Sequence, residues 1–120
     1  MNIKSTTPIL RSFDEDKAKK FYVDFLEFEI AFEHRFEKEL PLYLGLKKGD
    51  FELHLSEHHG DSSPGASIRI EIDNLKSFQE KLLKKKYKYS RPGIIKQDWG
   101  TMEMIIKDPF GNKLIFYKNN

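Results

Sequence analysis

The sequence predicts an α+β fold in which two β-α-β-β-β modules form curved mixed sheets around a cleft. Three observations predict it. Two short segments have the apolar spacing of amphipathic helices, and most of the remaining chain alternates apolar and polar residues as strands do. These elements also follow in the same order in both halves, so we expect one domain with modules spanning about 1–58 and 66–120.

The first half is predicted to hold one helix and four strands. Apolar residues recur at helical spacing from Asp14 to Phe28, and Ser12 and Asp14 are candidate caps for the start of this helix. The four expected strands lie around Ile3–Leu10, Glu29–His34, Leu42–Leu46 and Phe51–Glu57.

The second half repeats this order. A helix is expected after Asp73-Asn74, where an apolar stripe recurs every three or four residues and most lysines lie off it. The residues of the stripe are Leu75, Phe78, Leu82 and Leu83. The four expected strands lie at Ala66–Ile72, around Lys88–Ser90 or a little beyond, at Thr101–Lys107 and at Asn112–Lys118. Turn sequences rich in Gly, Pro, Asp and Ser separate the strands.

The two halves align at an offset of about 61 residues. Under that offset Leu53 and Leu55 correspond to Leu114 and Phe116. The two halves share almost no identical residues, so it is the order of predicted helices and strands that indicates the repeat.

Composition limits the possible classes of function. The 120 residues suit one compact domain with an ordinary core, and the absence of Cys excludes thiol catalysis, zinc-thiolate sites and disulfides. A net charge of +2 left by 21 basic and 19 acidic residues does not indicate a nucleic-acid binder. No apolar run is long enough to span a bilayer and the first residues lack the apolar stretch of a signal peptide, so we expect a cytoplasmic protein with no membrane partner.

Strand alternation sorts residues onto two faces of the sheets. The apolar face, which the helices can cover, is predicted to contain Phe51, Leu53, Leu55, Ile68, Ile70, Ile72, Leu114 and Phe116. The opposite face is predicted to contain Glu52, His54, Ser56, Ser67, Arg69, Glu71, Lys113, Ile115 and Tyr117. This second face is either the solvated side of a flat sheet or, if the sheet curls, the lining of a polar cleft.

Two further features are candidates for a site. His58, His59 and Asp61 are close in sequence and could hold a metal on their loop, although closeness in sequence does not guarantee closeness in space. Trp99 lies between loop-like flanks, where a large aromatic residue marks a binding edge more often than a core position.

The order of elements and several motifs resemble the vicinal oxygen chelate superfamily, which includes glyoxalases, ring-cleaving dioxygenases and bleomycin resistance proteins. The motifs are Phe21–Leu26, Trp99–Glu103 and Asp108–Leu114, and the resemblance covers essentially the whole chain. Within the superfamily the sequence most resembles the bleomycin resistance proteins, through Thr7–Arg11, Leu53–Glu57 and the Trp-Gly followed by Asp-Pro-x-Gly-Asn.

The resemblance implies where a metal site would lie in an enzyme of this superfamily. The four ligand positions carry over to Thr7, His54, Ser67 and Ile115, and only His54 is a strong ligand. We therefore expect no metal and no cofactor. Bleomycin resistance proteins similarly lack these ligands, and the resemblance implies that they sequester the drug in grooves between two chains.

The resemblance also assigns groove residues. Phe32, Ser56 and Trp99 match groove positions of the family, whereas Arg69 replaces an aromatic residue and Ala31 an acidic one. Local carboxylates, Glu103 among them, would then bind a cationic ligand. The predicted ligand-binding residues are Phe32, His54, Ser56, Arg69, Trp99, Glu103 and Tyr117.

The sequence thus favours a metal-independent homodimer that sequesters a bleomycin-like antibiotic and catalyses no reaction. Two alternatives remain at this stage. One is a glyoxalase-like, metal-dependent lyase or isomerase with an atypical site around His54 and the His58-His59 loop. The other is a binding protein for a different metabolite.

Overall fold

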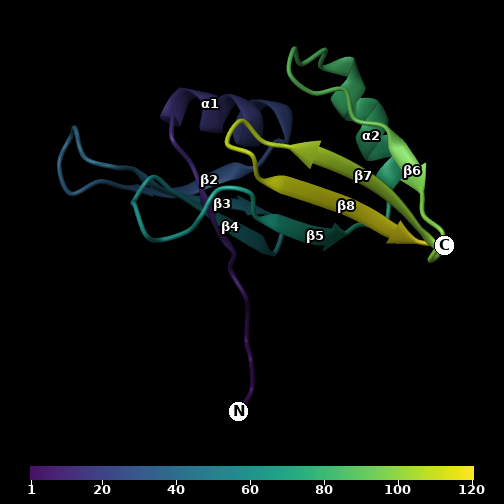
Figure 1. The fold of residues 1–120 in the computed structure, drawn as a ribbon, viewed down its shortest axis with the longest axis horizontal. Coiled ribbons are helices and arrows are strands. Elements are labelled where there is room, and N and C mark those ends of the chain that lie inside the picture. Colours follow the sequence, from purple (N-terminus) through teal and green to yellow (C-terminus); the bar gives the residue numbers. More distant parts are fainter.

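The computed structural model describes residues 1–120 and contains two four-stranded sheets (Figure 1). The first module comprises β1 (Ile9–Arg11), α1 (Glu15–Lys19), the π-helix η1 (Lys20–Phe25), β2 (Glu29–His34), β3 (Tyr43–Lys48) and β4 (Phe51–Ser56). The second comprises β5 (Ser67–Glu71), α2 (Leu75–Lys84), β6 (Ile94–Lys96), β7 (Thr101–Lys107) and β8 (Lys113–Asn119). This confirms the predicted α+β fold and the order of its elements.

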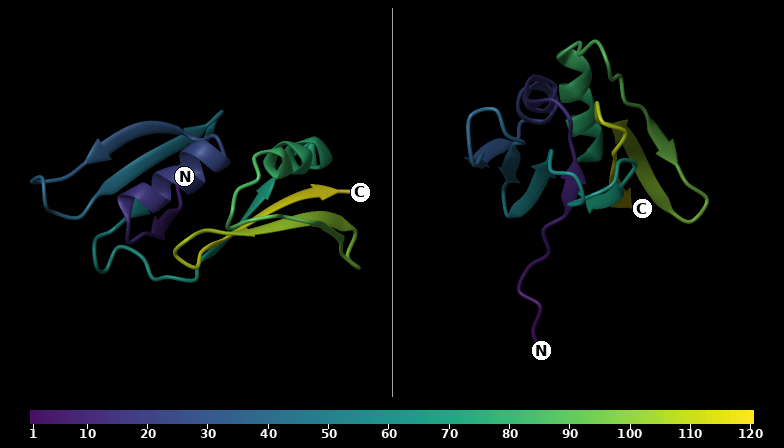
Figure 2. Two further views of the ribbon diagram at one scale, coloured as in Figure 1. Left: turned by 90° about the horizontal axis from the view of Figure 1, so that it is seen from above. Right: turned by 60° about the vertical axis from the view of Figure 1, so that its left-hand side comes forward.

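The two sheets have the same topology. Their strand orders are β1-β4-β3-β2 and β5-β8-β7-β6, and in each the first strand is parallel to the last while the other pairs are antiparallel. Figure 2 shows the helices of both modules next to each other on one side of the two sheets. The other face of each sheet is therefore left uncovered by helices.

The first helix is shorter and wider than predicted. Asp14 caps it by accepting a hydrogen bond from the Lys17 amide at 2.8 Å. After Lys19 the backbone adopts π geometry, with the Leu26 amide bonding back to the Phe21 carbonyl, and the positive φ of Glu27 ends the helix. The spacing of the apolar residues in the sequence does not reveal the wider turns of this π-helix.

Two strand predictions were wrong in position. Instead of Ile3–Leu10, only Ile9–Arg11 form β1. Pro8 has no amide hydrogen to donate to a neighbouring strand, and the chain before it extends away from the sheets (Figure 1). Lys88–Ser90 form no strand, and β6 lies four residues further along the chain. The cause is Tyr87, whose ring stacks on Phe25 at a centroid distance of 4.6 Å and holds this segment against η1.

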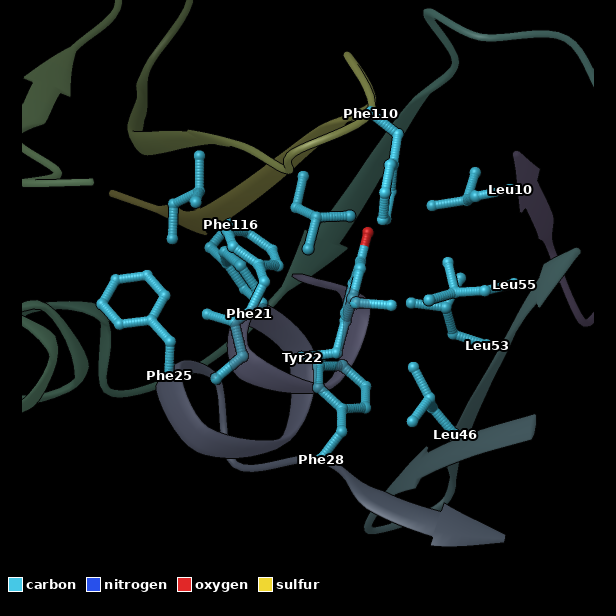
Figure 3. Close-up of a cluster of buried hydrophobic side chains, with 14 of the residues drawn as sticks. Leu10, Phe21, Tyr22, Phe25, Phe28, Leu46, Leu53, Leu55, Phe110 and Phe116 are labelled. Atoms are coloured by element: carbon cyan, nitrogen blue, oxygen red, sulfur yellow. The ribbon is translucent and has the colours of Figure 1, made fainter. Parts of the chain in front are cut away.

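One continuous core joins both modules. The predicted apolar residues Leu53, Leu55, Leu114 and Phe116 are buried, and the others pack half-buried around them. Figure 3 shows Tyr22 between the leucines of the first sheet and the phenylalanines that surround Phe116. No helix has the length and apolar character needed to cross a membrane.

A buried polar network fixes the two modules to each other inside this core. The Tyr22 hydroxyl of η1 donates to Asp108 at 2.6 Å, in the turn between β7 and β8. Asp108 also accepts from the amides of Phe110 and Asn112 and from the Asn112 side chain, which in turn donates to the Arg11 carbonyl of β1. Burial beside the Asp108 carboxylate raises the pKa of Tyr22 well above its usual value, so the phenol remains a donor.

Candidate functional site

The helix-free face of the first sheet carries a cluster of rings. Strand pairing places Phe32, Gly45 and His54 in one row across β2, β3 and β4. The Phe32 ring lies parallel to that of Tyr43, with centroids 6.1 Å apart, and meets the edge of His54 at 5.2 Å. We call Phe32, Tyr43 and His54, with the carboxylate of Glu52, the ring cluster.

His54 is held at both ring nitrogens. Tyr43 Oη lies 2.8 Å from Nδ1, and Glu52 Oε2 lies 2.6 Å from Nε2. A carboxylate can only accept, so the neutral imidazole that fits both contacts carries its proton on Nε2 and accepts the Tyr43 hydroxyl at Nδ1. Burial, together with nearby Asp61 and Glu52, raises the pKa of Tyr43 and so favours this donor role.

A glycine makes room for the ring cluster. A Cβ atom added to Gly45 would lie 2.2 Å from Phe32 Cε1. The missing side chain therefore lets the Phe32 ring lie flat on the backbone of β3, where it remains 39% exposed. One face of an aromatic ring is thus available to a ligand.

The second sheet carries an ion-pair cluster on the corresponding face. The Glu103 carboxylate of β7 accepts from the Thr101 hydroxyl at 2.7 Å and the Trp99 indole at 3.3 Å, and pairs with Arg69 of β5 at 3.0 Å. The hydrogen bond from Thr101, supported by Arg69 and Trp99, lowers the pKa of Glu103. Arg69 also lies over the Tyr117 ring of β8, with 4.2 Å from Cζ to the centroid.

Trp99 is a turn residue and is 67% exposed. The sequence left open whether it packs in the core, and the structure rules that out. We call Arg69, Trp99, Thr101, Glu103 and Tyr117 the ion-pair cluster. It leaves most of the indole and part of the guanidinium accessible.

The structure therefore divides the predicted site residues into groups. Phe32 and His54 lie together in the ring cluster, and Arg69, Trp99, Glu103 and Tyr117 lie together in the ion-pair cluster. Ser56 joins neither. Its side chain is fully buried, donates to Asp61 at 2.7 Å and accepts from the His58 amide, so it holds the loop that follows β4.

Three further residues of these clusters were not predicted as site residues. Glu52 was placed on the correct face, but no signal paired its carboxylate with His54. Tyr43 and Thr101 could be assigned to the clusters only through the strand register, which places Tyr43 opposite Ser56 and Thr101 opposite Asn119. A face assignment extended to the third strand of each module would have found them.

The residues present do not fit a metal site of the glyoxalase type. His54 has both nitrogens engaged, Ile115 offers no donor atom, and Thr7 and Ser67 offer only hydroxyl groups. Asp61 is committed to Ser56 rather than grouped with His58 and His59, and no three His, Cys, Asp or Glu side chains gather closely enough to hold a metal ion.

Comparisons with known proteins agree with this fold. A family model described as glyoxalase superfamily protein matches residues 1–120. A search of curated proteins finds no match to the chain. Among solved structures, the bleomycin-binding protein of Streptomyces verticillus in complex with copper(II)-bleomycin is 25% identical, with a TM-score of 0.74 and coverage of 100% of this chain and 99% of that one.

Two other solved structures are similar over nearly their whole length. A bleomycin resistance determinant encoded on the transposon Tn5 is 24% identical, with a TM-score of 0.72 and coverage of 98% of this chain and 99% of that one. An antibiotic-binding protein from a Streptomyces species is 20% identical, with a TM-score of 0.70 and coverage of 100% and 99%. These similarities extend to both modules.

Proposed function

The chain belongs to the glyoxalase superfamily, and from this premise we propose that it sequesters a flat, cationic, partly aromatic small molecule of the bleomycin type. The proposal involves no metal and no catalytic step. It is supported by structural neighbours whose names state that they bind bleomycin, and by the chemistry of the two clusters on the helix-free faces.

The exposed aromatic surface beside carboxylates carries this proposal. Phe32 and Trp99 present ring faces on which a flat ligand can stack. Trp99 donates to the Glu103 carboxylate, and Phe32 contacts His54, which is paired with Glu52, so a carboxylate that can attract a cation belongs to each cluster. Glu52 is the more available of the two, because Glu103 is already paired with Arg69. A cationic ligand would therefore place its charge near Glu52 and its rings between Phe32 and Trp99.

We further propose that the cleft forms between two copies of the chain. The residues that line the helix-free faces include several exposed apolar side chains, and each cluster lies open on its own sheet. The exposed residues are Phe32, Ile95, Trp99 and Ile105. Covering them with a second copy would bury apolar surface and enclose a ligand between a ring cluster and an ion-pair cluster.

Titration of metal-free protein with metal-free bleomycin tests this function. Trp99 is the only tryptophan, so its fluorescence reports on the cleft directly. We expect saturable quenching at about one drug per chain, as the drug stacks on the indole. A lack of saturation up to about 1 mM drug, where the binding free energy is only about 4 kcal/mol, would contradict the proposal.

Variants followed by calorimetry assign the binding to the clusters. Trp99→Phe and Phe32→Ala should each weaken binding about tenfold or more, since the first reduces a stacking surface and the second removes one. Tyr89→Ala is the control, because Tyr89 is also an exposed aromatic residue but lies beside the helices. Stoichiometric divalent metal retained in the purified protein would instead favour the lyase alternative.

Sedimentation at several protein concentrations tests the dimer. The expected result is a mass of two chains, and replacement of Ile95 and Ile105 with Asp should shift it to one chain, because like charges would be buried in the contact. A monomer that still binds the drug at full strength would contradict the shared cleft.

A further inference from the structure

We propose a second binding site on the opposite side of the molecule, for a small ligand that carries a flat ring and a phosphate group. It occupies a hollow of about 470 Å³ between the first helix and the second module, a size typical of small-molecule sites. We call it the lysine pocket. Its lining is Lys17, Lys20, Phe21, Tyr87, Tyr89, Lys107, Asp108 and Pro109.

The pocket is built where three segments distant in sequence meet. Lys17 comes from α1, Lys20 from η1 and Lys107 from the end of β7, and the segment after α2 closes one side. Stacking of Tyr87 on Phe25 holds that segment against η1, and the bond from Tyr22 to Asp108 holds the turn after β7 against the same helix. The fold thus fixes the walls of the pocket in place.

The charge of the pocket selects an anion. Lys17, Lys20 and Lys107 form no salt bridge, so no carboxylate of the chain neutralises their charges. The one carboxylate in the lining, Asp108, is buried and already accepts four hydrogen bonds. Another carboxylate, that of Asp24, lines a neighbouring hollow together with Lys20. Three lysines therefore face one exposed carboxylate and one buried carboxylate around the pocket. Lysines act as point charges toward a phosphate group.

Tyrosines supply the surface for the ring. Tyr87 forms part of the wall, and its ring meets the edge of Tyr89 at 5.7 Å. Tyr89 is 76% exposed, although burying a tyrosine is favourable, and Tyr87 and Lys88 are the side chains that contact its ring. A planar group that stacks on Tyr89 would place an attached phosphate among the three lysines.

Adenosine monophosphate, adenosine and inorganic phosphate are suitable probes, titrated into the full chain at low ionic strength. Amide chemical shifts in NMR spectra report where each one binds. For the monophosphate we expect saturable shifts in Lys17–Phe21, Tyr87–Tyr89 and Lys107–Pro109, and no shifts on β2–β4. Adenosine and phosphate alone should each bind at least tenfold more weakly, because each makes only half of the contacts.

Paired variants separate the pocket from general surface charge. The double variant Lys20→Gln, Lys107→Gln should weaken binding of the monophosphate about tenfold or more, whereas Lys38→Gln, Lys118→Gln changes the net charge equally at exposed positions outside the pocket. Tyr89→Ala should weaken it similarly, with Phe36→Ala as the control at an equally exposed aromatic residue.

Three results would overturn the proposal: absence of saturation at about 10 mM, equal binding of adenosine, or equal loss in the control pair. Shifts confined to the helix-free faces would also overturn it. The outcome is independent of the bleomycin titration, since Trp99→Phe should leave binding of the monophosphate unchanged.

Discussion

The two modules place different chemistry on equivalent strands. In the first, Gly45 of β3 lies opposite His54 of β4, and Phe32 of β2 covers the glycine. In the second, the equivalent pair is Ile105 and Ile115, and β6 begins opposite Met104 and therefore does not reach Ile105. The second module fills its face instead with Arg69 from the inner edge and Trp99 from the loop before β7.

This difference shows that the fold constrains which residue types stand on the buried face of each sheet, and that residue types on the other face can vary. Leu55 and Phe116 occupy equivalent core positions and are both buried, whereas His54 and Ile115, one residue away, share no chemistry. An aromatic cluster around His54 and an ion-pair cluster around Glu103 can therefore be combined on one scaffold. The turns differ as well, since the β3–β4 turn is short and exposed while the β7–β8 turn enters the core.

The largest expected effect contrasts these two turns. Asp108→Ala removes the acceptor of four buried hydrogen bonds, and each unmade buried bond costs about 1–3 kcal/mol before water or relaxation compensates. We expect the free energy of unfolding to fall by about 3–5 kcal/mol in urea denaturation. Asp50→Ala, in the exposed β3–β4 turn, should change it by less than about 0.5 kcal/mol. Equal losses would mean that Asp108 does not join the modules.

The sequence was sufficient for the features that depend on local pattern. Alternation marked Leu53, Leu55, Leu114 and Phe116 as core, and turn residues separated most strands at the correct places. The position of β6 could not be predicted, because it depends on the contact between Tyr87 and Phe25, which are far apart in the chain.

The site could be predicted only in part, for the same reason. His54, Arg69 and Tyr117 were placed on the correct face by alternation alone. Their partners Tyr43 and Thr101 required the register of a neighbouring strand, and the role of Ser56 required the fold of the loop that contains Asp61. Closeness of His58 and His59 in sequence had suggested a metal group that the loop does not assemble.

The second expected effect tests whether the glycine creates the ring cluster. Gly45→Ala would force the Phe32 ring to move, so its contacts with Tyr43 and His54 should be lost at a cost of about 1 kcal/mol. The ring shifts of His54 in NMR spectra should change with it. The equivalent substitution Ile105→Ala in the second module should leave those shifts as they are. Unchanged His54 shifts in the glycine variant would show that Phe32 does not depend on Gly45.

A smaller effect concerns the Glu103 carboxylate, which has no acidic counterpart in the first module, where Tyr43 stands at the equivalent position. Thr101→Val should raise the pKa of Glu103 more than Arg69→Gln does, because the Thr101 hydrogen bond is the larger cause of its lowering. Carboxyl carbon shifts during an NMR titration measure both values. If the pKa of Glu103 rose more in Arg69→Gln than in Thr101→Val, the ion pair with Arg69 would be the main cause of its lowering.

The smallest expected effect compares the residues that end the two helices. Glu27 and Lys86 both take a positive φ just after η1 and α2, but only Glu27 has salt-bridge partners, Lys81 and Lys85. Hydrogen bonds from Lys85 and Lys81 lower the pKa of Glu27 to about 2. Because Glu27 is partly exposed and solvent screens the pairs, Glu27→Gln should cost only about 0.5–1 kcal/mol at pH 7.

The pH dependence of this cost gives a further check. A carboxylate with a lowered pKa stabilises the folded state above its usual pKa and loses that contribution as the pH falls. The difference between the wild type and Glu27→Gln should therefore be complete at pH 7, shrink below about pH 4.5 and vanish near pH 2. Lys86→Gln should show no such dependence. A difference that persisted at pH 2 would mean that Glu27 acts through its backbone conformation rather than through its charge.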